Sequence, residues 1–353
     1  MRIGIPREIK TLEGRVALVP AACGDLVQAG HEVFIEAGAG DKSGFSDQDF
    51  EHVGVEVLPD AEALYGKAEL LVKVKEPIEG DLQYLRSDHL LFCYLHLAAE
   101  PKLTERLLEI GLTGVAFETV EEADGSLPLL APMSNIAGRI GVQVGTHLLH
   151  QPEGGRGVLL GGLPAADRGH VVVLGAGAAG GNSARLAASS GARVTVFDKR
   201  QDRLAEMMAI GSNVTALYPY GETVGEFVSK ADLVIGAVLV TGARAPHVIS
   251  RGMISSMNEG SVVVDISVDQ GGCVETTRPT TYADPTYQVD GVTHFAVTNM
   301  PGAVPRTSSQ ALSATILPYV QHMARPDWEG VQALSRGVNV RGGELVHPAL
   351  KQA

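Results

Sequence analysis

A glycine-rich turn between an apolar strand and a helix constrains the fold of this chain more than any other feature. Residues Val171–Leu174 form an uninterrupted apolar run, which is typical of a strand buried on both faces of a parallel sheet. Gly175, Gly177 and Gly180 follow, then a small-residue segment and a second strand ending in Asp198. Strand, glycines, helix, strand and terminal acid in this order predict a dinucleotide-binding βαβ unit, with an unliganded glycine turn as the alternative.

Each glycine of this turn has a separate expected role. Gly175 permits the tight turn, Gly177 lets a pyrophosphate approach the backbone, and Gly180 lets helix and strand pack closely. The helix N-terminus offers N–H groups and a partial positive charge to the phosphates. Asp198 is expected to hydrogen-bond the adenosine ribose, which favours NAD over NADP, although the two basic residues after it weaken that exclusion.

The rest of the chain reads as alternating strands and helices on both sides of this unit. Expected strands end in short turns before apolar helical segments, and they cover 2–6, 32–36, 70–74, 90–95, 114–118, 171–174, 193–197, 233–238, 261–266 and 294–298. The sequence therefore predicts an α/β fold of two Rossmann-like domains with parallel sheets. An NAD-binding domain (131–304) is expected to be inserted into a discontinuous substrate domain (1–130 and 305–353).

Two long helices are expected where the chain passes between these domains. One begins near Ser134, since apolar residues recur at every fourth position along 136–148. The other opens at Thr307, with Gln310 at capping-box spacing. The tail after about Arg325 is glycine-rich and predicts no particular structure.

Composition and charge exclude several classes of function. The chain has 353 residues and a net charge of −13, so it shows no basic footprint for nucleic acid or an anionic membrane. No apolar run is long enough to span a bilayer and no signal segment is evident, which predicts a cytoplasmic protein without a membrane partner. The three cysteines lack metal-binding spacing, so buried free thiols and no metal site are expected.

Polar residues follow several of the expected strands, where open parallel sheets bind ligands. They are Arg15, Lys75 and His96 in the first domain, and Asp269 and Asn299 in the second. We expect these side chains to face one cleft between the domains, beside the nicotinamide.

Each of these residues also has a structural explanation. Arg15 fits a solvated loop charge, and His96 fits a satisfied core histidine. Lys75 shares its parity with Lys73, as on the wet face of an edge strand. Asp269 and Asn299 both precede turn sequences, and turns favour these residue types.

Several stretches of the sequence resemble the alanine dehydrogenase family and, more distantly, the alpha subunit of proton-pumping transhydrogenase. The resemblance runs from residue 1 to about 325. The stretches that carry it are MRIGIPRE at 1–8, GRVA at 14–17, LVKVKEP at 71–77, LHLAA at 95–99, LLAPMS at 129–134, ADLVIGAVLV at 231–240, VDISVDQGG at 264–272 and TNMP at 298–301.

The resemblance implies a reversible oxidative deamination of L-alanine to pyruvate and ammonium, with NAD as cofactor and a homohexamer as the assembly. It implies that His96 and Asp269 form the catalytic pair, and that Arg15 and Lys75 bind the substrate carboxylate. Besides the three glycines, the implied cofactor contacts are Ser134, Ala178, Ala179, Asp198, Arg203, Val238, Leu239, Ile266, Arg278, Val297, Asn299 and Met300.

The sequence departs from the family in two places. Pro219 stands where the family often has a serine, which puts one adenine-side contact in doubt, and the short tail puts the final helix in doubt. Three other functions remain open: an NAD(H)-binding transhydrogenase subunit, a nucleotide-binding protein without activity, and a dehydrogenase for another small amino acid. A pocket the size of a methyl group discriminates an extra methylene by only about 1–3 kcal/mol, so the sequence leaves the last alternative open.

Overall fold

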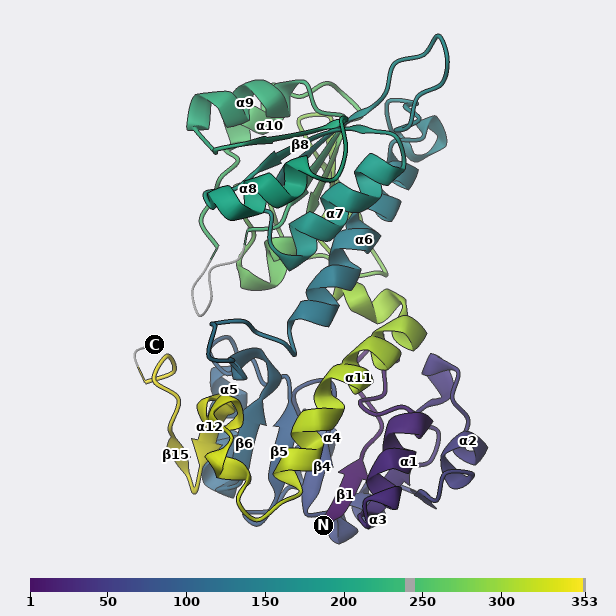
Figure 1. Ribbon diagram of the computed structural model, residues 1–353, viewed down its shortest axis with the longest axis vertical. Helices are drawn as coiled ribbons and strands as arrows, with labels where there is room; N and C mark the ends of the chain where they lie inside the picture. Colours follow the sequence, from purple (N-terminus) through teal and green to yellow (C-terminus); the bar gives the residue numbers. More distant parts are fainter. Residues whose placement is uncertain (239–244, 352–353) are drawn as a thin grey trace. The chain divides into compact units, whose positions relative to one another are not determined.

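The computed structural model describes residues 1–238 and 245–351 of the chain. These residues form two compact units, each with its own sheet (Figure 1). Unit 1 comprises Met1–Met133 and Gly302–Ala353, and unit 2 comprises Ser134–Pro301. The second unit is therefore inserted into the first, as the sequence predicts.

The sheet of unit 1 has eight strands among the described residues, in the order β15-β14-β6-β5-β4-β1-β2-β3. The strands β1 to β6 run parallel, and β14 pairs antiparallel with both β6 and β15. Their bounds are β1 Arg2–Ile5, β2 Glu32–Glu36, β3 Glu56–Leu58, β4 Leu70–Val72, β5 Leu90–Cys93, β6 Thr113–Ala116, β14 Val338–Arg341 and β15 Glu344–Leu345.

Helices of unit 1 connect these strands and cover the sheet. They are α1 Pro20–Gln28, α2 Asp47–Glu51, α3 Ala61–Lys67, α4 Glu79–Leu82, α5 Pro101–Ile110, α11 Pro305–Met323 and α12 Gln332–Gly337, with short 3₁₀ turns η1 Asp41–Ser43, η2 Phe117–Thr119 and η6 Trp328–Gly330. The long helix α11 packs against α1 and η1 (Figure 1). It thereby lies next to the segment that carries Arg15.

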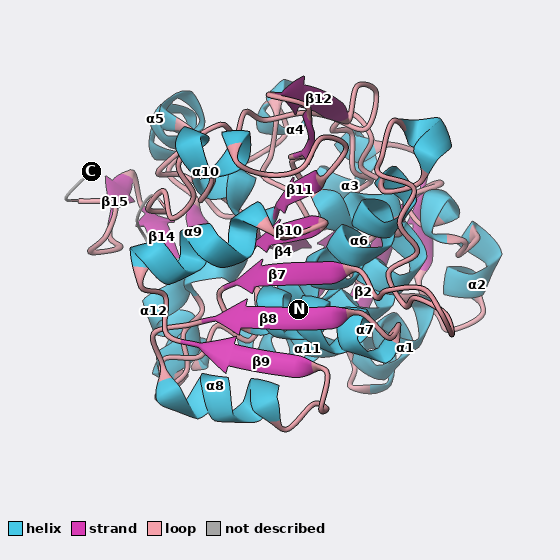
Figure 2. Ribbon diagram, turned by 90° about the horizontal axis from the view of Figure 1, so that it is seen from above, coloured by secondary structure: helices cyan, strands magenta, loops and turns pink. Residues whose placement is uncertain are grey.

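The sheet of unit 2 has seven strands among the described residues, in the order β12-β13-β11-β10-β7-β8-β9. All neighbours are parallel except β12 and β13, and Figure 2 shows β7, β8 and β9 side by side in one direction. Their bounds are β7 His170–Leu174, β8 Arg193–Phe197, β9 Val214–Leu217, β10 Leu233–Gly236, β11 Val262–Asp265, β12 Thr286–Val289 and β13 Val292–Phe295.

The helices of unit 2 place the glycine turn at the end of β7. They are α6 Ala131–Leu148, which begins in unit 1, α7 Ala178–Ser189, α8 Gln201–Met208, α9 Gly221–Ser229 and α10 Arg251–Ser255, with 3₁₀ turns η3 Gln151–Glu153, η4 Ile266–Gln270 and η5 Met300–Ala303. The hydroxyl of Ser183 on α7 donates to the carbonyl of Gly138 on α6 at 2.8 Å. A Cβ on Gly138 would lie 2.1 Å from the carbonyl oxygen of Ala179, so only glycine allows this close approach.

The expected α/β class is confirmed, and the expected helix starts need correction. The first linking helix begins at Ala131, three residues before Ser134. The last long helix begins at Pro305 with Val304 as its N-cap and no side-chain cap, so the capping box at Thr307 is wrong. Proline fits the first helical position because its missing N–H would have no partner there.

Both sheets are mixed rather than purely parallel. The tail, for which no structure was expected, supplies α12, the strand β14 and the edge strand β15. Strands also end earlier than expected: β5 stops at Cys93 instead of Leu95, and β6 stops at Ala116 instead of Glu118. The polar residues His96 and Glu118 therefore lie outside the sheet, in the turns that follow these strands.

The three cysteines Cys23, Cys93 and Cys273 are buried and free. Within the described residues, no helix is both long and apolar enough to cross a membrane. The same residues hold no cluster of three or more His, Cys, Asp or Glu side chains suited to a metal ion.

Candidate active site

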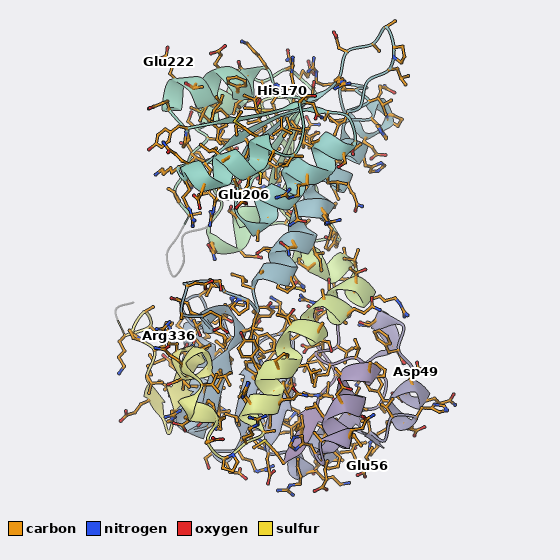
Figure 3. All side chains as sticks on the ribbon, viewed as in Figure 1. Asp49, Glu56, His170, Glu206, Glu222 and Arg336 are labelled. Atoms are coloured by element: carbon orange, nitrogen blue, oxygen red, sulfur yellow. The ribbon has the colours of Figure 1, made fainter. Side chains whose placement is uncertain are left out.

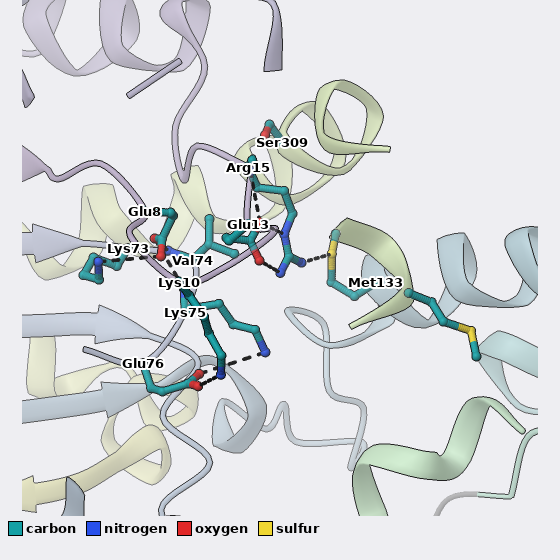
Figure 4. A network of polar contacts seen from close by, with 12 residues as sticks. Glu8, Lys10, Glu13, Arg15, Lys73, Val74, Lys75, Glu76, Met133 and Ser309 are labelled. Carbon is teal, nitrogen blue, oxygen red and sulfur yellow. Dashed lines mark hydrogen bonds and ion pairs between the residues drawn. The ribbon is translucent and has the colours of Figure 1, made fainter. Parts of the chain in front are cut away.

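Arg15 of unit 1 is a buried cation paired with a buried carboxylate. Its side chain is 2% exposed and that of Glu13 is 0% exposed, so the alternative of a solvated loop charge is wrong. Nε and Nη2 of Arg15 donate to the two carboxylate oxygens of Glu13 at 2.7 and 2.5 Å. The third nitrogen, Nη1, contacts the sulfur of Met133 at 3.1 Å (Figure 4). Burial lowers the pKa of Arg15, but the hydrogen bonds and charge of Glu13 outweigh it and leave this pKa raised.

Serines of α11 and η1 hold the Arg15 segment in place. The main-chain N–H of Val16 donates to Ser309 Oγ at 2.9 Å, and that of Val19 donates to Ser313 Oγ at 3.0 Å. Ser43 Oγ donates to the carbonyl of Gly14 at 2.8 Å. The guanidinium is thus carried by a backbone that two other elements anchor, which fixes its position before any ligand binds.

A second buried charge network lies beneath the end of β4. Lys73 is 1% exposed, and its Nζ lies 3.6 Å from Glu8 and 3.3 Å from Asp81. Because β4 pairs with both β1 and β5, it is an inner strand, and the alternative of a wet edge-strand face is wrong. Burial lowers the pKa of Lys73, but Glu8 and Asp81 outweigh it and raise this pKa. The lysine therefore stays charged inside unit 1.

Glu8 connects this network to Lys75. Its Oε1 accepts the main-chain N–H of Val74 at 2.7 Å and that of Lys75 at 3.4 Å. The Lys75 side chain is 13% exposed, with Nζ 4.0 Å from Glu76. Figure 4 shows Lys10 reaching the same carboxylate. The Lys75 ammonium thus lies just beyond the end of β4, and Glu8 holds the backbone of this segment.

His96 follows β5 in a turn that leaves its imidazole accessible. The side chain is 40% exposed, so the core-histidine alternative is wrong. Its φ is +50°, in the left-handed region that non-glycine residues rarely adopt. The main-chain N–H of His96 donates to Glu118 Oε1 at 2.6 Å. The imidazole plane is within 4° of the Tyr94 ring plane, with ring centroids 5.7 Å apart.

Tyr94 brings the basic groups of unit 1 together. Its ring stacks on His96, and its hydroxyl donates to the carbonyl of Leu129 at 2.7 Å. Burial raises the pKa of Tyr94, and the nearby Arg15 guanidinium opposes this rise. Tyr94 thus contacts His96 and lies within electrostatic range of Arg15, and unit 1 holds both a cation for an anion and an accessible imidazole.

The glycine turn of unit 2 has the geometry of a dinucleotide-binding loop. Gly175 has φ +92°, and a Cβ there would lie 2.4 Å from the carbonyl oxygen of Ala237. A Cβ on Gly180 would lie 1.8 Å from the carbonyl oxygen of Gly175. At Gly177, the N-cap of α7, the nearest atom would be Arg203 Nη1 at 3.6 Å. Close backbone contacts thus require glycine at 175 and 180. At Gly177 the backbone has space beside it for a ligand.

Asp198 stands at the end of β8, where an acid is expected. Its carboxylate accepts the N–H of Ala176 at 2.7 Å and that of Arg200 at 2.8 Å, and Arg203 Nη1 lies 3.7 Å away. The acid therefore ties the glycine turn to the start of α8. Two carboxylate oxygens accept about four hydrogen bonds, so capacity remains for a hydroxyl donor.

A groove of about 370 Å³ opens beside this turn within unit 2. It lies between the N-terminus of α7 and the exposed side of α8, where Figure 3 labels Glu206. Its lining residues include Gly177 and Ala178 from the turn and Arg203 from α8. Ala178 and Ala179 begin α7, where main-chain N–H groups have no intrahelical partner.

Asp269 is exposed and lies in η4. The buried acid Asp265 holds this loop in place through hydrogen bonds. Asp265, at the end of β11, accepts N–H groups of Ser267, Cys273 and Val274 and the Thr277 hydroxyl, at 2.6 to 3.1 Å. Asp265 is thus the anchor of the segment that presents Asp269. The expectation that Asp269 is a turn residue also fits, since η4 ends at the left-handed Gly271.

The other expected cofactor contacts belong to the strand ends and helix starts of unit 2. Arg278 is exposed, its guanidinium 4.1 Å from the centre of the Tyr287 ring. Asn299 has φ +60°, which also fits the turn expected there. Leu239 lies outside the described residues. Ser134, Val238 and Ile266 are half-buried, and Val297 and Met300 are buried.

The structure places Arg15, Lys75 and His96 in unit 1, and Asp269, Asn299 and the glycine turn in unit 2. Sequence reasoning missed the acids that hold the basic residues: Glu8, Glu13 and Glu118. Glu118 is the last residue of an expected strand, so the search for polar residues at strand ends that identified His96 could also have found Glu118. Glu8 and Lys73 are far apart in sequence, and no pattern in the chain pairs them.

Comparisons with known proteins cover almost the whole chain. The family model for the N-terminal domain of alanine dehydrogenase/PNT matches residues 4–137, and that for the C-terminal domain, a nucleotide-binding domain, matches residues 141–348. The alanine dehydrogenase of Mycolicibacterium smegmatis is 48% identical over 355 residues, covering 99% of this chain and 96% of that protein.

Solved structures agree with these sequence matches. A structure of an L-alanine dehydrogenase aligns with a TM-score of 0.96 at 49% identity, covering 100% of this chain and 98% of that one. A transhydrogenase structure from Sinorhizobium meliloti aligns with a TM-score of 0.85 at 26% identity, covering 99% and 100%.

Proposed function

Because this chain belongs to the alanine dehydrogenase/PNT family, we propose that it catalyses the NAD-dependent interconversion of L-alanine with pyruvate and ammonium. The observation that carries the proposal is the buried Arg15–Glu13 pair beside Tyr94, with Lys75 and His96 in the same unit. An anion-binding guanidinium near an accessible imidazole suits a keto acid. The transhydrogenase alternative is weaker, since that structure shares 26% identity against 49%.

The substrate carboxylate would be bound by the cations of unit 1. Glu13 occupies the Nε edge of the Arg15 guanidinium and turns the Nη1 end toward Met133. A guanidinium donates through more than one edge, so this end can meet a carboxylate when the thioether moves aside. Lys75 adds a second positive charge, as a point charge with rotatable donors.

His96 would exchange a proton with the substrate oxygen as a general acid or base. The exposed ring at the end of β5 allows such contact. Asp269 of unit 2 would orient the reacting groups and stabilise positive charge that develops on the imine nitrogen. A methyl-sized side chain on the substrate is the expected preference, in keeping with the relatives' name.

NAD fits the glycine turn of unit 2. The backbone at Gly177 is open, and Asp198 offers oxygens to the ribose hydroxyls while disfavouring a 2′-phosphate. Bound there, the cofactor would supply hydride acceptance and donation. Arg203 and Ala178 line the groove beside the turn and are assigned to the cofactor with the other expected contacts. We also infer a homohexamer, which light scattering on the purified protein would test.

Gly180→Ala is expected to weaken NADH binding by at least about tenfold, or 1.4 kcal/mol. The new Cβ would meet the carbonyl oxygen of Gly175 at 1.8 Å, so the turn must open. Titration of NADH fluorescence measures this. Gly221→Ala in α9 is the control, because no atom of the described residues lies within 4 Å of its added Cβ, and it should bind normally. Equal affinities of the two variants would count against the turn as the cofactor site.

The proposed function is tested by following NADH absorbance with purified protein. Alanine, serine, valine, glycine and glutamate are offered in turn with NAD, and alanine again with NADP. The proposal expects the highest kcat/KM for alanine with NAD. Preference for another amino acid would overturn the substrate assignment, and no turnover with any would overturn the dehydrogenase assignment.

A further inference from the structure

The acid Glu118 meets the backbone of His96 because two neighbouring strands end side by side. β5 and β6 run parallel, and their last pair is Cys93 opposite Ala116. Glu118 lies in η2, directly after β6, and Leu95 and His96 lie just after β5. The chain of β5 then turns at His96 while the Glu118 side chain reaches across.

Glu118 accepts two consecutive main-chain N–H groups from the segment that follows β5. Its Oε1 accepts that of His96 at 2.6 Å and that of Leu95 at 3.2 Å, and its Oε2 lies 3.3 Å from the Leu95 nitrogen. The Glu118 side chain is only 17% exposed. A shielded carboxylate bonded to backbone N–H groups makes strong, charge-assisted hydrogen bonds.

These bonds stabilise an unfavourable conformation. His96 has φ +50°, which costs free energy for a residue with a Cβ and persists only where the surroundings enforce it. Past His96 the turn closes with a bond from the Ala99 N–H to the His96 carbonyl at 2.9 Å. The Glu118 carboxylate therefore stabilises the start of the turn at Leu95 and His96, and the Ala99–His96 bond stabilises its end.

The same carboxylate lies near the imidazole without a hydrogen bond to it. Its Oε1 lies 3.9 Å from His96 Nδ1, so Nδ1 is the ring nitrogen that faces the acid. The Tyr94 ring lies parallel to the imidazole at 5.7 Å between centroids. Glu118 thus restrains the backbone of His96 and Tyr94 its ring face, and Nε2 is the nitrogen turned away from the acid.

We propose that Glu118 is a positioning residue for the reaction: it locks His96 in the left-handed turn and thereby aims Nε2 at the substrate oxygen. The proposal rests on the proposed function, since it assigns a purpose to the imidazole. Displacement of a reacting group by about 1 Å costs on the order of 100-fold in rate, so loss of the lock should act on kcat.

The test compares two replacements of similar size. Glu118→Gln keeps an oxygen that accepts both N–H groups, whereas Glu118→Met offers only a weak thioether acceptor. We expect kcat for pyruvate reduction to fall by about 10–100-fold in Glu118→Met. In Glu118→Gln it should stay within about threefold of wild type, because the amide oxygen rescues the lock. The KM for pyruvate should change little in either variant, since Arg15 and Lys75 are untouched.

A double variant shows whether Glu118 acts through His96. In the His96→Ala background, adding Glu118→Met should change kcat by less than about twofold, because residues that act as a unit are not additive. Glu121→Met, three residues further along, is the matched control and should behave as wild type. Urea unfolding followed by the fluorescence of Trp328 establishes that unit 1 is folded in each variant.

Several results would overturn the proposal. They are wild-type kcat in Glu118→Met, equal damage in Glu118→Gln, or multiplying losses in the double variant. If Glu118→Met does not fold, Glu118→Asp replaces it, since this withdraws the carboxylate by one methylene, and wild-type kcat there has the same meaning. Inactivity of the wild type toward alanine and pyruvate would instead refute the proposed function, so the two failures are distinct.

Discussion

His96→Ala is expected to lower kcat for both alanine oxidation and pyruvate reduction by about 10²–10⁴-fold, the usual contribution of a general acid or base. The imidazole is the titratable group that the turn after β5 leaves accessible beside Tyr94. Steady-state rates from NADH absorbance measure the loss. The affinity for NADH should not change, because the glycine turn belongs to unit 2.

The matched control for this variant is His52→Ala. His52 is an exposed histidine of the same unit, and its Nδ1 contacts only the carbonyl of Gln48 among the hydrogen bonds of the described residues. Its replacement should leave kcat unchanged. Turnover of His96→Ala within a few-fold of wild type would remove the imidazole from the chemistry.

Glu13→Ala is expected to lower the free energy of unfolding of unit 1 by about 3–5 kcal/mol, because it removes the carboxylate that accepts two hydrogen bonds from the buried guanidinium. Glu13 and Arg15 are 0% and 2% exposed. Urea unfolding followed by fluorescence of the single tryptophan, Trp328, measures the change within unit 1.

Two further variants separate the buried charge from general damage. Glu109→Ala breaks the exposed pair with Arg106 and should cost no more than about 1 kcal/mol. Glu13→Leu combined with Arg15→Met removes both charges and should recover most of the lost stability while abolishing pyruvate binding. Unfolding of Glu13→Ala within about 1 kcal/mol of wild type would contradict the proposed pairing.

The parts of the fold that the sequence predicted are those in which burial requires apolar residues or glycine at fixed positions. The apolar run before Gly175 marks a central strand, and the glycines mark the turn, because backbone contacts at Gly175 and Gly180 exclude any Cβ. The antiparallel strands β12, β14 and β15 were not predictable. They are short strands at or next to a sheet edge, and β14 pairs with β6, which is distant in sequence, so no local pattern marks it.

The candidate site was predictable in its basic residues and not in the acids that hold them. Arg15, Lys75 and His96 stand at strand ends or loops, which the sequence can locate. Glu13 and Glu118 act through contacts that only the folded chain brings about, one through a side-chain pair and one between the ends of two neighbouring strands. Arg15 is buried because of these contacts, whereas the sequence around it favoured a solvent-exposed side chain.

The most direct test of the proposed function is to follow deuterium from L-alanine labelled at Cα. The protein is incubated with this substrate and NAD, and the reduced cofactor is isolated and examined by mass spectrometry and NMR. Direct hydride transfer predicts that the nicotinamide ring carries the deuterium. Reduced cofactor without the label, or no reduction at all, would contradict the proposed function.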